Sequence, residues 1–190
     1  PPPLGIEYVI DKVSIIPIFL ISFINSLASS FAHNFFKTEI DNTLIPKTYS
    51  LWLLAIAGMM GLVTTADAFN LFVFLEISSL SAVALVALGS KMDRKALVAG
   101  YNYLILGAVG ATFYVIGVGL LYGLTGTLNM NDLAQKIPQL GINKSVIVAF
   151  TFMILGIMVK AAIFPLHIWL PNAYAYAPSP VSVLLAATAT

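Results

Sequence analysis

The stretch AFNLFVFLEISSLSAVALVALGS, residues 68–90, decides the fold of this chain. It contains one charged side chain, Glu76, in a run of apolar and weakly polar residues. The hydrocarbon core of a bilayer is about 30 Å thick, and about 20 helical residues cross it. Residues 68–90 are therefore predicted to form a membrane-spanning helix that carries a carboxyl group inside the membrane.

Similar apolar stretches lie on both sides of this segment. They occupy residues 13–32, 48–66, 96–126 and 145–163, and a truncated further run begins at residue 181. Because only Asp67 separates 48–66 from 68–90, these two stretches are expected to lie side by side as an antiparallel pair. We expect an all-α fold, a polytopic transmembrane helical bundle.

The composition indicates a lipid environment and excludes several functions. Hydrophobic residues make up 59% of the 190 residues and charged residues 9%, and the mean hydropathy is +0.96. The net charge of +1 and the scattered basic residues argue against nucleic-acid binding. The absence of cysteine excludes iron–sulfur ligation, thiol redox chemistry and disulfides. We expect no cofactor and no metal site, so any redox chemistry would belong to another chain.

Both ends of the sequence are expected to be cuts through a longer protein. The start, PPPLGIEYVIDK, has no basic region, methionine or cleavage site typical of a signal peptide. The last residues, VSVLLAATAT, lie inside an apolar run.

The distribution of basic residues predicts the orientation in the membrane, because cytoplasmic loops carry an excess of Lys and Arg. One side holds Lys37, Lys47, Lys91, Arg94 and Lys95, and the other holds Lys12, Lys136 and Lys144. The first side is therefore assigned to the cytoplasm. We therefore expect a multi-pass protein of the cell membrane with its N-terminal stretch on the outer side.

Two charged residues lie inside the predicted spans, Glu76 and Lys160. Each would cost a few kcal/mol if left alone in hydrocarbon, so the two are expected to pair across the bundle. Counted from the outer ends of their helices, their depths differ by about 10 Å, and uncertain helix starts can account for most of this difference. The pair can be a structural ion pair or a proton relay. We favour the relay, because the proton affinity of a buried lysine depends on the neighbouring carboxylate.

A break in the helical pattern follows Lys160. Pro165 and Pro171 remove backbone donors, so residues 164–178 are expected to be non-helical or interrupted and to face the interior of the bundle. His167 lies in this break and can serve as a proton shuttle near the cytoplasmic end. Alternatively, its ring can hydrogen-bond the backbone carbonyls freed by the prolines.

Other residues are given structural roles. Asp67 is expected to cap or stabilise the tight turn between two spans, and the polar loop 127–144 to hold a short surface helix. The glycines of 96–126 include one GxxxG spacing, Gly119 and Gly123, in a run interpreted as a packing face. Trp52 and Trp169 are expected in the interfacial aromatic belt.

Three stretches of the sequence resemble a known family. They are TADAFNLFVFLEISSLSAVALVAL (65–88), YNYLILGAVGATFYVIGVGLLYGLTGTLNMNDL (101–133) and VKAAIFPLHIWLPNAYAYAPSPVSVLL (159–185). Together they are similar to the antiporter-like subunits of respiratory complex I, of group 4 membrane-bound hydrogenases and of Mrp-type sodium/proton antiporters. The sequence of these stretches most resembles the Mrp D subunit. The resemblance implies a larger transporter fold of two inverted repeats, each with a discontinuous helix, and residues 1–190 are expected to form part of this antiporter-like transmembrane domain.

The resemblance also implies roles for three residues. Glu76 falls on the family's fifth-helix glutamate, Lys160 on its seventh-helix lysine, and His167 on the polar position after the helix break. The function expected is proton translocation, with or without exchange for sodium, in a complex with other membrane subunits. The alternatives are a proton-pumping membrane subunit of a quinone-reducing or hydrogen-evolving oxidoreductase, and a structural spacer.

Overall fold

A computed structural model describes residues 5–141 and 143–188, which form helices joined by turns. No β-strand occurs in these residues, which contain only two isolated β-bridges. The α-helices are α1 (Ile15–Glu39), α2 (Ile45–Thr64), α3 (Ala68–Ala87), α4 (Lys95–Thr125), α5 (Met130–Lys136), α6 (Lys144–Lys160), α7 (Leu170–Tyr176) and α8 (Ser179–Thr188). Short 3-10 segments are η1 (Asn42–Leu44), η2 (Leu88–Lys91) and η3 (Ile137–Leu140).

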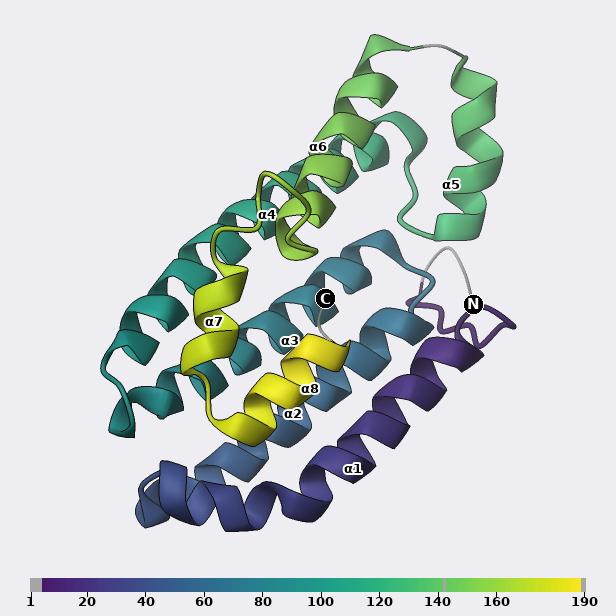
Figure 1. The fold of residues 1–190 in the computed structure, drawn as a ribbon. Coiled ribbons are helices and arrows are strands. Elements are labelled where there is room, and N and C mark those ends of the chain that lie inside the picture. Colours follow the sequence, from purple (N-terminus) through teal and green to yellow (C-terminus); the bar gives the residue numbers. More distant parts are fainter. Residues whose placement is uncertain (1–4, 142, 189–190) are drawn as a thin grey trace.

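Helix α3 lies in the middle of the bundle (Figure 1). It packs against α2 on one side and α4 on the other, α4 packs most extensively against α6, and α1 packs against α8. Within the described residues, four helical segments are long and apolar enough to cross a membrane: Ile15–Glu39, Asn42–Thr64, Ala68–Lys91 and Lys95–Thr125. The chain is thus an all-α, multi-pass membrane protein.

Polar contacts join three segments at one end of the bundle. Isolated bridges connect Tyr8 with Thr65 and Asp67 with Asn129. The Asp67 carboxylate accepts the Asn70 backbone N–H at 2.7 Å, which confirms that Asp67 caps the tight turn. The surface helix expected in the loop 127–144 is also confirmed, as α5. The N-terminal stretch, the α2–α3 turn and the α4–α5 connection therefore lie at the same end.

The opposite end is held by contacts from the end of α1. Glu39 accepts the backbone N–H of Ser179 at 2.7 Å, and Lys91 donates to the Ile40 carbonyl at 2.9 Å. Helix α1 continues to Glu39, beyond residue 32, where the sequence-based span ends. The helix persists because Phe36 is fully buried and its ring packs edge-on against Tyr49 and Trp52.

The glycines that bring α4 and α6 together are Gly110, Gly117 and Gly156. A Cβ at Gly156 would lie 2.5 Å from the Gly110 carbonyl oxygen, and one at Gly117 would lie 2.5 Å from the Ala149 carbonyl oxygen. The GxxxG pair singled out in the sequence does not make this contact, because Gly119 and Gly123 have no described neighbour where a Cβ would stand. Residues that pack on α6 must lie on one face of α4. Gly110 and Gly117 do so, because they are two helical turns apart.

We predict that Gly156→Ala destabilises the bundle by about 1–3 kcal/mol, because its Cβ would meet backbone atoms of α4 that cannot move aside. Thermal unfolding of the detergent-solubilised protein, followed by circular dichroism, measures the change. Gly119→Ala is the matched control and should leave the midpoint unchanged or slightly raised, since alanine favours helix. Equal destabilisation by both substitutions would contradict the assigned packing face.

Candidate functional site

The site is built around the ammonium group of Lys160, the last residue of α6. Its Nζ atom donates to Oε1 of Glu76 at 2.9 Å and to Oγ of Ser79 at 2.8 Å. The Lys160 side chain is 10% exposed and the Glu76 side chain 26%. The structure thus brings together the two charged residues that the sequence places inside the spans.

Both acceptors come from one face of α3. Glu76 and Ser79 are three residues apart and therefore point in similar directions from the helix. Helix α4 leaves room for the lysine, because a Cβ at Gly107 would lie 3.7 Å from Nζ. Ser79 was not singled out from the sequence. The signal that identifies it is its i+3 spacing from the only carboxylate in this span.

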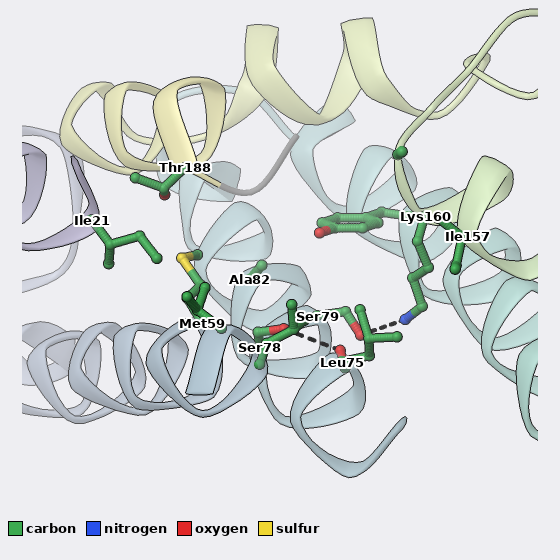
Figure 2. A pocket seen from close by; sticks show the side chains of 13 residues that line it. Ile21, Met59, Leu75, Ser78, Ser79, Ala82, Ile157, Lys160 and Thr188 are labelled. Atoms are coloured by element: carbon green, nitrogen blue, oxygen red, sulfur yellow. Dashed lines mark hydrogen bonds between the residues drawn. The ribbon is translucent and has the colours of Figure 1, made fainter. Parts of the chain in front are cut away.

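A cavity of about 220 Å³ adjoins Lys160 and Ser79 (Figure 2). Its walls come from α1, α2, α3, α4, α6 and α8, with Lys160, Ser78 and Ser79 among its polar residues. Figure 2 shows Lys160 reaching toward Ser79, with Met59 and Ile21 farther along the cavity. Such a space is large enough for several water molecules, each of which occupies about 30 Å³ in the liquid. The lysine therefore borders a space that water can fill.

The helix break begins at Ala161, directly after the lysine. The Ala161 N–H still donates to Ile157 at 2.8 Å, and Ala162 then adopts a φ of 51°, which turns the chain away from the helix axis. The expected span 145–163 thus ends at Lys160, before Pro165 is reached. Pro171 lies in the first turn of α7, so it begins a helix within the segment expected to be irregular.

Trp169 holds the break against α4. Its indole ring stacks on the Tyr103 ring with centroids 4.2 Å apart, and Nε1 donates to the Val159 carbonyl at 3.1 Å. Trp169 is 3% exposed, so its expected place in the interfacial belt is wrong. Trp52 is also buried and donates to Asn25. Each indole N–H has a polar partner inside the bundle, which makes burial favourable.

His167 is separate from the Glu76–Lys160 pair. It does not line the 220 Å³ cavity, and its ring lies 5.5 Å from that of Phe164. Its Nδ1 atom is buried and has no hydrogen-bond partner among residues 5–141 and 143–188. The structure therefore does not show the ring bonding the carbonyls freed by the prolines. Nor do three or more His, Asp or Glu side chains gather into a metal-binding group in the part described.

Residues 65–190 match the family described as NADH:quinone oxidoreductase/Mrp antiporter, TM. The chain belongs to this family. It is 46% identical over 190 residues to NADH-quinone oxidoreductase subunit N of Desulforudis audaxviator (strain MP104C), covering 100% of this chain and 37% of that relative. The resemblance to antiporter-like subunits is confirmed.

Solved structures of this family share the fold. A chain of the archaeal membrane-bound sulfane sulfur reductase superposes with a TM-score of 0.85 and 37% identity, covering 99% of this chain and 37% of that one. A chain of the Mrp complex from Dietzia sp. DQ12-45-1b gives a TM-score of 0.83 and 28% identity, covering 100% and 34%. This antiporter-family chain thus spans about a third of the length of the proteins it matches.

We predict that Trp169→Phe lowers stability by about 1–3 kcal/mol, because the ring can still stack on Tyr103 but the buried Val159 carbonyl loses its donor. Thermal unfolding in detergent tests this. Tyr101→Phe, which removes a hydroxyl from an exposed side chain of α4, should leave the midpoint unchanged. A Trp169→Phe variant as stable as wild type would show that this hydrogen bond does not hold the break.

Proposed function

We propose that this chain translocates protons across the membrane and that the Glu76–Lys160 pair carries the transfer. The observation behind the proposal is the 2.9 Å contact between the two side chains within a bundle of apolar helices. A charged pair in such surroundings has a high desolvation cost, so a functional role is the first hypothesis for it. The adjoining cavity supplies space for water beside the lysine.

In the proposed mechanism, neutral Lys160 accepts a proton from water in the cavity and later releases it. Glu76 sets the affinity, because a nearby carboxylate favours the charged ammonium and a protonated or displaced carboxyl does not. We include His167 as a candidate acceptor beyond the helix break. Its support is the buried Nδ1 atom, which has no hydrogen-bond partner in the described residues.

We further propose that residues 1–190 are part of a larger antiporter-like domain in a complex with other membrane subunits. Two solved relatives are chains of multi-subunit assemblies, the sulfane sulfur reductase and the Mrp complex. We place the protein in the cell membrane with its N-terminal stretch outside. The support is the distribution of basic residues. The end of the bundle that holds Lys91, Arg94 and Lys95 carries more of them than the end that holds α5.

A second candidate is the membrane subunit of a respiratory oxidoreductase in which other chains perform the redox chemistry. The similarity to NADH-quinone oxidoreductase subunit N and to the sulfane sulfur reductase favours it. Proton transfer through the pair is common to both candidates. The source of energy separates them: a gradient of sodium or another cation for an antiporter, and electron transfer for an oxidoreductase.

We predict that Lys160→Ala abolishes proton translocation by the full-length protein in its complex while assembly is retained. Glu76 left without its partner can take up a proton, which costs less than keeping an unpaired charge in the bundle. Dye-monitored ΔpH in inverted membrane vesicles measures translocation. Lys144→Ala, which removes an exposed lysine from the other end of α6, is the control and should transport normally. Near wild-type transport by Lys160→Ala would refute the relay.

A double variant separates the relay from a structural spacer. Replacing a buried ion pair by apolar residues of similar volume is often neutral for stability or stabilising by about 1–4 kcal/mol. Glu76→Leu combined with Lys160→Met should therefore assemble and melt like wild type yet transport no protons. Native gels and thermal unfolding report assembly. If the double variant both assembles and transports, the pair only joins helices.

A further inference from the structure

Lys160 has a second acceptor besides Glu76, and it is the closer of the two. The distance from Nζ to Oγ of Ser79 is 2.8 Å, compared with 2.9 Å to the carboxylate. Ser79 is 9% exposed, so the contact is made inside the bundle. A hydrogen bond from a charged donor in such surroundings is stronger than one between neutral groups.

The Ser79 hydroxyl is fixed relative to α3 in a way that the Glu76 carboxylate is not. Its Oγ donates to the Glu76 backbone carbonyl at 3.4 Å, one turn earlier in the same helix. A serine side chain has one rotatable bond between the backbone and its oxygen, whereas a glutamate side chain has three rotatable bonds before its carboxylate oxygens. The serine acceptor is therefore restricted to the few rotamers of one bond, whatever the protonation state of the Glu76 carboxyl group.

Ser79 also stands between two spaces. It lines the 220 Å³ cavity and, on another side, a small cavity of about 10 Å³ that it shares with Glu76 and Gly107. Lys160 itself lines the larger cavity, and Glu76, its other acceptor, lines the smaller one. Ser79 thus contacts the lysine at a position that borders both spaces.

We propose that Ser79 is a positioning residue that keeps the Lys160 ammonium group in place when Glu76 is protonated or turned away. The inference rests on the proposed function, since it concerns how the lysine of that relay is held. With the carboxylate neutral, Ser79 supplies the remaining fixed acceptor on α3. The lysine then releases its proton from a defined position instead of from several rotamers.

The titratable groups that face Lys160 are few. Helix α3 contributes Glu76, and α4 contributes Tyr103, which lines both cavities. Within the described residues, α1, α2 and α8 contribute to the large cavity only apolar side chains and the hydroxyl of Thr188. A change in the pH profile that follows loss of the Ser79 hydroxyl therefore reports on the Glu76–Lys160 pair.

The test measures the pH dependence of proton translocation by the full-length protein in its complex in inverted vesicles. Ser79→Ala should shift the pH midpoint by about one unit toward lower pH, because the ammonium form loses an acceptor, and should lower the rate about tenfold near neutral pH. Ser79→Thr restores a hydroxyl and should return the midpoint to the wild-type value. Ser78→Ala is the matched control: Ser78 lines the same cavity, but its hydroxyl donates only to the Leu75 carbonyl.

The outcomes separate this inference from the proposed function. A shift with Ser79→Ala, none with Ser78→Ala and recovery with Ser79→Thr support the positioning role. An unshifted midpoint in Ser79→Ala overturns it, and so does a Ser79→Thr variant that behaves like Ser79→Ala. If Lys160→Ala still abolishes transport in that case, only the role of Ser79 fails. If Lys160→Ala transports protons, the relay itself fails.

Discussion

The ion pair between Glu76 and Lys160 is the interaction on which the rest of the site depends. Two opposite charges among apolar helices are tolerable only when they meet, and the 2.9 Å contact requires that α3 and α6 approach α4 closely at the same depth. Gly107 leaves space beside the ammonium group, and Ser79 adds an acceptor on the same face of α3 as the carboxylate. The packing around the pair follows from this requirement.

The end of α6 and the break that follows form a second unit of the structure. Gly156 lets α6 lie against the backbone of α4, and the helix then ends at Lys160. Ending a helix inside a membrane leaves carbonyl groups without partners, which must be satisfied within the protein. The indole N–H of Trp169 satisfies one of them, that of Val159, while the ring stacks on Tyr103 of α4. The break is therefore tied to the helix that also borders the cavity.

The two ends of the bundle are held by polar contacts of different kinds. At one end, backbone bridges and the Asp67 cap connect the N-terminal stretch with two interhelical loops. At the other, Glu39 and Lys91 bond to groups of Ser179 and Ile40. Both sets of contacts satisfy backbone groups near the ends of helices, where no helical partner exists. They connect α3, which carries Glu76, to neighbouring segments near both of its ends.

The sequence by itself determined the class of fold, the apolar stretches, the cap at Asp67 and the two charges within them, because hydropathy and charge are local properties. The contact between those charges was decided by tertiary structure. Helix α4 has 31 residues and α3 has 20, so α4 extends about 16 Å farther, and α6, packed on α4, begins beyond the end of α3 (Figure 1). This offset removes the apparent depth difference between Glu76 and Lys160. Tertiary structure likewise decided that helices α4 and α6 meet at Gly110, Gly117 and Gly156 and not at the GxxxG pair. It also decided that Trp169 is buried and that Ser79 contacts Lys160. Each of these depends on which helix faces the residue, and a single sequence does not contain that information.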